Sequence, residues 1–156
     1  MRPAPRAMRQ KRRRETTGRL VDCNVISEVR KGERANAGVL RFFQQAVRKE
    51  QDVFLSVVTA GELRRGVDLI RHRGDAAQAA ALETWLTNVL GDYGEGILNI
   101  DEDVAQVWGR LRVTHPENAL DKQIAATALI HGLTLVTRNE QDFSDTGVTV
   151  LNPFSH

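Results

Sequence analysis

The chain has 156 residues, of which 41% are hydrophobic and 27% are charged, and its formal net charge is +2. This composition predicts one folded domain and leaves no room for two domains of ordinary size. No apolar run approaches the roughly 18 residues of a membrane span, and the single cysteine, Cys23, excludes an internal disulfide framework and a cysteine-based zinc site. We therefore expect a cytoplasmic protein without a membrane segment.

The charge is distributed unevenly along the chain. Residues 1–19 contain eight Lys or Arg residues and one Glu, whereas the remainder has 14 basic and 19 acidic residues. Such a basic segment can bind nucleic acid through phosphate charge, or it can be a disordered, non-essential leader upstream of a true start at Met8 or later. We favour the second interpretation. The sequence then predicts a disordered basic extension over residues 1–18 and one domain over residues 19–156.

The hydrophobic pattern predicts strands that alternate with helices. Short apolar and β-branched runs indicate strands at residues 19–21, 52–58, 97–100, 133–137 and 148–151. Apolar residues at helical spacing indicate helices over residues 25–31, 37–50, 59–73, 76–90, 102–114 and 121–131. Alternation of this kind is typical of an α/β fold with three layers, in which a mostly parallel sheet of four to five strands lies between helices.

Polar oxygen-bearing residues follow the predicted strands or lie near helix starts. Asp22 comes directly after the first strand, and the other positions are Glu62, Asp121, Asn139 and Asp142. The carboxyl ends of parallel strands meet at one edge of a sheet, where such sheets bind ligands. Oxygen ligands suit Mg²⁺ and Mn²⁺, and these ions can activate water against a phosphodiester. The pattern predicts a metal held by Asp22 and Asp121, with Glu62, Asn139 and Asp142 as further candidates.

Each of these residues also has a purely structural interpretation. Asp22 can be the N-cap of a helix, and Asp121 can stabilise a helix N-terminus through its charge. Thr59-Ala60-Gly61-Glu62 has the spacing of a capping box, which would make Glu62 a capping residue. The two residues after the fourth strand can be ordinary turn residues. One metal site would explain all five positions together, and we therefore favour it.

Other reaction classes fit the sequence less well. A cysteine hydrolase would need Cys23 as a thiolate, which the neighbouring Asp22 disfavours. The four histidines lack the spacing of a zinc motif, and there is no glycine-rich phosphate loop. A phosphoaspartyl receiver would need paired acids after the first strand and a Lys after the last one, and neither is present.

Three stretches resemble the motifs of PIN-domain ribonucleases, in the order in which that family carries them. They are LVDCNVISEVR, LSVVTAGELRRGV and ALDKQIAATALIHGLTLVTRNEQDF, and the resemblance covers about residues 19–153. The whole is most similar to the VapC-like and FitB-like toxins of bacterial type II toxin–antitoxin modules. The resemblance implies a PIN-like α/β/α fold, Mg²⁺-dependent cleavage of RNA with Mn²⁺ as a substitute, a cognate antitoxin protein and a homodimer.

Matched residue by residue, the family's first three acids fall on Asp22, Glu62 and Asp121. Its fourth acidic position falls on Asn139, whose amide can coordinate a metal but brings no charge. Asp142 lies three residues further on and can compensate. By this resemblance the catalytic set is Asp22, Glu62, Asp121 and Asn139.

A second departure is Cys23, which stands where the family usually has Thr. A thiol is a weaker hydrogen-bond donor than a hydroxyl, so support for Asp22 is expected to be weaker. Together with Asn139, this leaves a second hypothesis open. In that hypothesis the chain is a catalytically weakened PIN fold that binds a protein or a nucleic acid.

Overall fold

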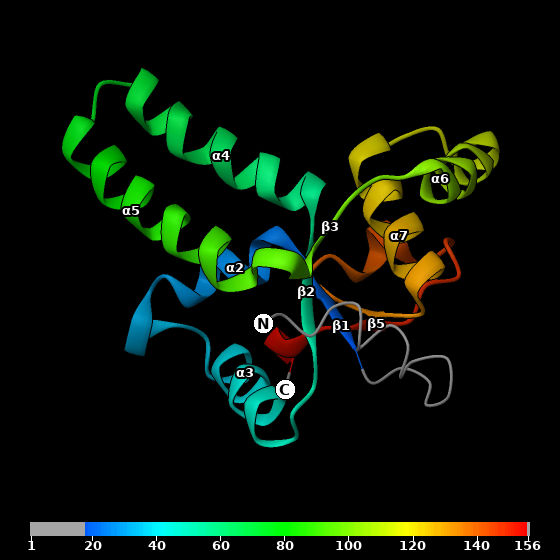
Figure 1. Cartoon of the computed structure of the whole chain (residues 1–156), viewed down its shortest axis with the longest axis horizontal. Coiled ribbons are helices and arrows are strands. Elements are labelled where there is room, and N and C mark those ends of the chain that lie inside the picture. The colour runs from blue at the N-terminus through cyan, green and yellow to red at the C-terminus, as the bar shows by residue number, and fades with distance from the viewer. Residues whose placement is uncertain (1–17, 156) are drawn as a thin grey trace.

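The computed structural model describes residues 18–155 (Figure 1). Its centre is a five-stranded sheet in the order β3-β2-β1-β4-β5, in which all neighbouring strands are parallel. The strands are β1 (Arg19–Val21), β2 (Val53–Ser56), β3 (Ile97–Leu98), β4 (Thr134–Val136) and β5 (Val150–Leu151). The predicted α/β class and strand number are confirmed.

Helices connect the strands. The α-helices are α2 (Cys23–Val29), α3 (Ala37–Arg48), α4 (Val57–His72), α5 (Ala76–Tyr93), α6 (Glu102–Thr114) and α7 (Ala119–His131). Single turns of 3-10 helix are η1 (Gly32–Arg34), η2 (Gly94–Gly96), η3 (Glu140–Phe143) and η4 (Pro153–Ser155). In Figure 1 the helices α6 and α7 lie on one side of the sheet, and α4 and α5 extend together on the other.

The three layers follow from the alternation of side chains along each strand. Leu20, Phe54 and Leu135 pack with Ile124 and Ala128 of α7 in one buried cluster. Their neighbours along the strands point to the opposite face and pack with α2, α3, α4 and α5 in a second cluster, which includes Val21, Leu55, Val136, Val25, Val39, Leu63 and Leu86. Nearly all strand residues are therefore apolar, as expected for a sheet that is covered on both faces.

Three helices, α2, α4 and α7, begin two residues earlier than the sequence predicts, and the reason is the same in α2 and α4. Asp22 caps α2 directly after β1, so this helix begins at Cys23 rather than at residue 25. Ser56, the last residue of β2, caps α4 by accepting a hydrogen bond from the Val58 N–H at 3.0 Å. The predicted strand 52–58 therefore ends two residues early, because a cap residue terminates each strand and starts the next helix without a loop.

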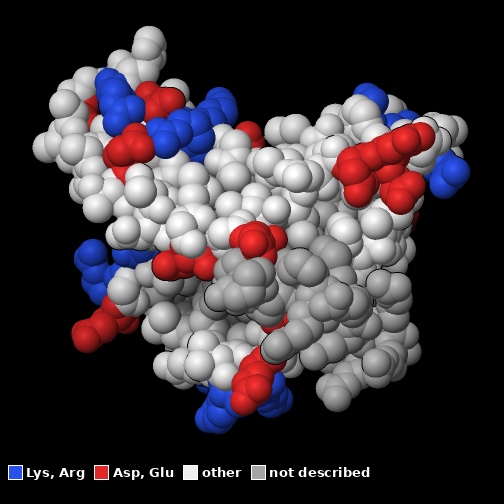
Figure 2. Space-filling model, in the orientation of Figure 1, with Lys and Arg blue, Asp and Glu red and all other residues white. Residues whose placement is uncertain are grey.

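The helices α4 and α5 are joined by ion pairs at some distance from the sheet, where Figure 2 shows basic and acidic side chains side by side. Arg64 of α4 binds Glu83 of α5 through two hydrogen bonds of 2.7 and 2.8 Å, and Arg71 binds the same carboxylate at 3.2 Å. These arginines hold the pKa of Glu83 at about 2. Within the part of the chain that the structure describes, no helix is both long and apolar enough to cross a membrane.

The predicted basic extension, residues 1–18, lies outside the described residues except for Gly18. The carbonyl of Gly18 accepts a hydrogen bond of 3.2 Å from the Thr134 N–H, next to the start of β1. The extension itself stays a prediction.

Candidate active site

Asp22 lies at the carboxyl end of β1, at the centre of the sheet. Its Oδ1 atom accepts a hydrogen bond of 2.8 Å from the Cys23 N–H, so the interpretation of Asp22 as an N-cap is correct. Its Oδ2 atom accepts a hydrogen bond of 2.8 Å from the Thr137 hydroxyl. Only 5% of the residue is exposed, and this burial raises the pKa of Asp22 although both hydrogen bonds act to lower it. Capping and a functional role are thus compatible in one carboxylate.

Thr137 connects the end of β4 to the start of α2. Its hydroxyl oxygen donates to Asp22 and accepts hydrogen bonds from the Asn24 side-chain amide at 3.3 Å and from the Asn139 N–H at 3.0 Å. The other end of the Asn24 amide accepts a hydrogen bond of 3.1 Å from the Arg138 N–H. The loop after β4 is therefore fixed to the loop after β1, and this fixes the orientation of the Asp22 carboxylate.

Asp121 lies in the first turn of α7 and is partly buried. Burial, and then the negative charges of Asp22 and Asp142, raise the pKa of Asp121 to about 6. The charge of Glu62 raises it further, and that of Lys122 opposes the shift. Like charges perturb one another in this way only over short distances. The fold therefore brings the acidic residues that were singled out in the sequence into one electrostatic cluster.

Glu62 reaches this cluster from the second turn of α4. The capping-box interpretation of Glu62 is wrong, because the N-cap of α4 is Ser56 and Thr59 is a fully buried residue inside the helix. Within residues 18–155, no hydrogen bond or ion pair is made by the Glu62 side chain, which is partly exposed. Its carboxylate oxygens therefore bind no other group among the described residues and are available to a ligand.

Asn139 and Asp142 follow β4 at the rim of the cluster. Both are exposed, and the carbonyl of Asn139 accepts a hydrogen bond of 3.2 Å from the Asp142 N–H. The charge of Asp142 raises the pKa of both Asp22 and Asp121. A fourth negative charge is thus present beside the pair although Asn139 is neutral. The two residues also line an open depression of about 400 Å³, together with Arg138, Glu140 and Gln141.

Cys23 is partly buried beside Asp22. Burial raises the pKa of the Cys23 thiol, a weak contact with the Ser27 hydroxyl at 3.9 Å lowers it, and the charges of Asp22 and Glu62 raise it. Since a nucleophilic cysteine needs a lowered pKa, the structure gives no support to cysteine chemistry.

The donor set suits a hard divalent cation. Among residues 18–155, no three His, Cys, Asp or Glu side chains stand close enough to enclose a metal without help from other ligands. Mg²⁺, however, usually takes one or two carboxylates and keeps several water molecules. Burial, with the charges of nearby acids, raises the pKa values of Asp22 and Asp121, so positive charge placed between them would stabilise their ionised forms. A divalent cation is a group that could provide this charge.

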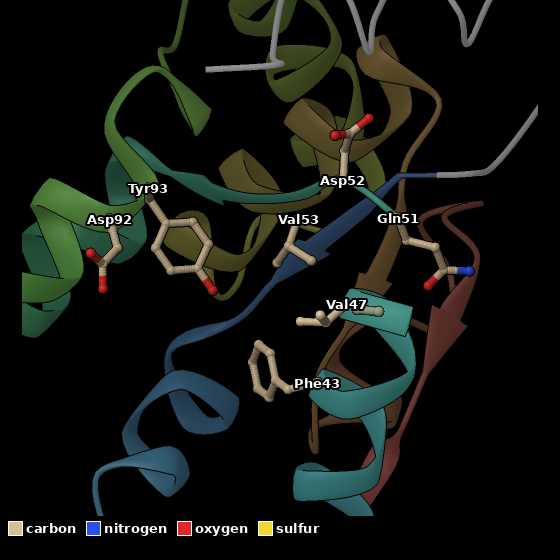
Figure 3. Close-up of a pocket in the computed structure, with 8 residues that line it drawn as sticks. Phe43, Val47, Gln51, Asp52, Val53, Asp92 and Tyr93 are labelled. Carbon is tan, nitrogen blue, oxygen red and sulfur yellow. The ribbon is translucent and has the colours of Figure 1, made fainter. Parts of the chain in front are cut away.

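A second cavity of about 430 Å³ lies elsewhere. It is lined by residues of α3, the start of β2 and the end of α5, among them Phe43, Val47, Val53 and Tyr93 (Figure 3). Val53 is the first residue of β2, so this cavity lies at the amino ends of the strands, whereas Asp22 lies at their carboxyl ends. It contains none of the predicted site residues, and we do not assign the reaction to it.

Sequence reasoning did not assign a role to Thr137 or Asn24. Their positions were informative, because Asn24 is two residues after Asp22 and Thr137 directly follows a strand. However, sequence spacing does not show which residue lies against another that is more than 100 positions away. The expected ligands Asp22 and Asp121 and their neighbours Glu62 and Asp142 are brought together.

Comparison with known proteins is consistent with this geometry. The family model of the PIN domain matches residues 19–148. Toxin FitB of Neisseria gonorrhoeae (strain ATCC 700825 / FA 1090) is 34% identical over 140 residues, which cover 86% of this chain and 97% of that protein. VapC ribonuclease Y4jK of Sinorhizobium fredii (strain NBRC 101917 / NGR234) is 28% identical over 145 residues, which cover 86% of this chain and 96% of that protein.

Among solved structures, the crystal structure of FitAcB from Neisseria gonorrhoeae is similar, with a TM-score of 0.76 and 34% identity, over 88% of this chain and 99% of that chain. The region matched by the PIN domain family model runs from β1 almost to β5, so it contains every predicted site residue. The resemblance to FitB-like and VapC-like toxins is confirmed. This chain belongs to the PIN domain family.

Proposed function

We propose that this protein is a Mg²⁺-dependent endoribonuclease and the toxin of a type II toxin–antitoxin module. The observation that carries the proposal is the pairing of two acids, Asp22 at the end of β1 and Asp121 at the start of α7, whose pKa values are both raised. Relatives named as a toxin and as a ribonuclease support the same reaction. Mn²⁺ has similar ligand preferences and is expected to substitute.

In this proposal Asp22 and Asp121 hold the cation. A bound divalent ion supplies positive charge that polarises the phosphodiester and favours ionisation of the attacking water. Thr137 holds Asp22 in one orientation through the hydrogen bond to Oδ2. Glu62, which caps no helix, accepts the proton of the attacking water at its carboxylate. Asn139 and Asp142 complete the rim, where Asp142 adds the charge that Asn139 lacks.

The alternative of a weakened PIN fold rests on Asn139 and Cys23. The charge of Asp142 beside Asp22 and Asp121 argues against it, because the number of nearby carboxylates is not reduced. The Asp22 carboxylate also receives a hydroxyl donor, from Thr137 rather than from residue 23. We therefore favour an active site over a relic.

The partners follow from the same relatives. Solved structures that are similar to this chain include toxin–antitoxin complexes, and we propose a cognate antitoxin as the protein that restrains the nuclease. We further propose that the protein forms a homodimer and acts on RNA in the cytoplasm. Co-expression with the product of the adjacent gene should relieve growth arrest in a bacterial host.

The decisive experiment is RNA cleavage by the purified protein with Mg²⁺ or Mn²⁺, compared with the same reaction in EDTA. The matched control is Asp22→Asn, which keeps the volume of the side chain and removes its charge. We expect cleavage by the wild type with metal only, and none by the variant. Equal cleavage by Asp22→Asn would show that the activity comes from elsewhere and that the assignment is wrong.

A further inference from the structure

The negative charge of the carboxylate cluster repels the phosphate groups of the proposed RNA substrate. RNA is a polyanion, and the charges of three further acidic side chains act on Asp121 where the RNA backbone is expected to bind. A cation supplied by the protein is needed near the cluster to hold a second phosphate group. Lys122 is unsuitable, since it is only 3% exposed and its ammonium group donates to the Glu117 carbonyl at 3.1 Å.

Arg138 has the required position. It follows Thr137 directly, and its backbone N–H donates to Asn24, so its place in the chain is fixed to the same network that holds Asp22. It is exposed and lines the 400 Å³ depression together with Asn139 and Asp142. Among the residues that line this depression, Arg138 is the one that carries a positive charge.

The guanidinium group of Arg138 is held in place without being neutralised. Its Cζ atom lies 3.9 Å from the centre of the Phe154 ring, in a cation–π contact. Within residues 18–155 it forms no salt bridge at 4.0 Å or less, although its charge acts on Glu28. Stacking on a ring restricts the side chain but leaves the N–H donors at the edge of the guanidinium plane available to an anion.

The backbone of Phe154 is held by hydrogen bonds. The Phe154 N–H donates to Oδ1 of Asn152 at 3.0 Å, and the Asn152 side-chain amide donates to Glu140 at 2.7 Å. The C-terminal turn η4 is thereby tied to the loop that contains Arg138. A preorganised guanidinium beside a phosphodiester-cleaving cluster matches the planar, bidentate geometry of a phosphate group.

We propose that Arg138, stacked on Phe154, binds a backbone phosphate of the RNA strand next to the phosphodiester that is cleaved. The proposal rests on the proposed nuclease function, since that function identifies RNA as the ligand. The contact is to the backbone and is therefore independent of base sequence. It supplies affinity and register, whereas the carboxylates supply the chemistry.

Binding is tested by fluorescence anisotropy with a labelled single-stranded RNA of mixed sequence, in EDTA to prevent cleavage, over a series of salt concentrations. Arg138→Ala should weaken binding roughly three- to tenfold and lower the slope of log affinity against log salt by about 0.7. Arg138→Lys should keep most of the slope but bind less tightly, because an ammonium group neither stacks nor bonds in a bidentate manner.

The matched control is Arg48→Ala. Arg48 is an exposed arginine at the end of α3, which leads to the opposite edge of the sheet, so its loss removes the same charge away from the cluster. It should leave affinity and slope unchanged. Phe154→Leu keeps an apolar side chain but removes the ring, and it should weaken binding less than Arg138→Ala does. Thermal unfolding of each variant shows whether the fold is intact.

Cleavage kinetics separate this proposal from the function on which it rests. Arg138→Ala should raise KM several-fold with little change in kcat, whereas Asp22→Asn abolishes turnover. If the wild type cleaves RNA and Arg138→Ala has the wild-type affinity, salt slope and KM, the phosphate site is refuted and the nuclease stands. If the wild type binds RNA without cleaving it and Arg138→Ala weakens that binding, the nuclease function is refuted and the phosphate-binding role of Arg138 is supported. Absence of RNA binding by the wild type would overturn the phosphate site as well.

Discussion

The hydroxyl of Thr137 donates a hydrogen bond of 2.8 Å to Oδ2 of Asp22, across 115 positions of the chain. Both residues are buried at the ends of neighbouring strands, and the same hydroxyl oxygen accepts the Asn139 N–H. One side chain thus fixes the proposed metal ligand and the loop that follows β4.

Thr137→Val should therefore damage both stability and activity. The valine fills the same space but removes the hydrogen-bond partner of Oδ2 of the buried Asp22 carboxylate and of the Asn139 N–H. This loss should cost about 1–3 kcal/mol of unfolding free energy, measured in urea. Cleavage should fall roughly tenfold or more, as for other residues that orient a metal ligand. Thr137→Ser keeps the hydroxyl and should retain most of the stability and most of the cleavage activity. Equal losses in the two variants would mean that packing, rather than the hydrogen bond, is important.

Asp121→Asn should abolish cleavage and stabilise the metal-free fold at neutral pH. The pKa of Asp121 in the folded chain is about 6, above the roughly 3.9 of an unfolded carboxyl, so ionisation of this residue opposes folding. The contribution of Asp121 to the stability of the wild type therefore falls as the pH rises from about 4 to 6, and Asn removes this loss. Melting temperatures in EDTA should be higher for the variant above pH 6 and should converge near pH 4. A lower melting temperature of the variant at pH 7.5 would contradict the sign of the shift.

Addition of Mn²⁺ provides a second readout of the same variant. Metal should raise the melting temperature of the wild type, because it binds the folded state alone. It should have little effect on Asp121→Asn, which has lost one of the two principal ligands. Identical metal-induced shifts would remove Asp121 from the site.

Glu62→Ala should abolish or strongly reduce cleavage with little change in stability. The N-cap of α4 is Ser56, so Glu62 contributes no capping energy. The contrasting variant is Ser56→Ala, which should cost about 1 kcal/mol of unfolding free energy through loss of the cap. Chemical denaturation beside a cleavage assay compares the two. A large loss of stability in Glu62→Ala with activity retained would restore a structural role.

Asp142→Asn and Asn139→Asp distinguish two sources of the fourth charge. Asp142 acts on both Asp22 and Asp121, so its neutralisation should weaken Mn²⁺ binding and reduce cleavage. Asn139→Asp should tighten metal binding and lower the Mn²⁺ concentration for half-maximal cleavage. Calorimetric titration of both variants beside the wild type measures this. An unchanged curve for Asn139→Asp would mean that position 139 does not face the ion.

The position of Asp22 could be predicted from the sequence because a short apolar run that ends in an acid is typical of a buried parallel strand that leads into a ligand site. The order of strands and helices followed from hydrophobic period in the same way. The start of α4 could not, because Thr59 and Glu62 have the spacing of a capping box and the actual cap, Ser56, looked like part of a strand. Two local patterns competed, and burial of Thr59 in the core decided between them.

The role of Thr137, and the effect of Asp142 on the pKa values of Asp22 and Asp121, could not be predicted from local sequence patterns for another reason. The hydrogen bond to Asp22 depends on β4 being the neighbour of β1, which is a property of strand order. The influence of Asp142 depends on the η3 turn, which brings this residue back towards the sheet. Spacing along the chain specifies neither of these.

The position of β4 between β1 and β5 also has a consequence for the timing of synthesis. Asp22 is made early, but the hydroxyl that orients it belongs to Thr137, and β1 gains its second neighbour only when β4 has been translated. A nascent chain in which β4 has not yet been made therefore lacks an assembled site. For a protein proposed to cut RNA, this order of assembly delays activity at least until β4 has been made.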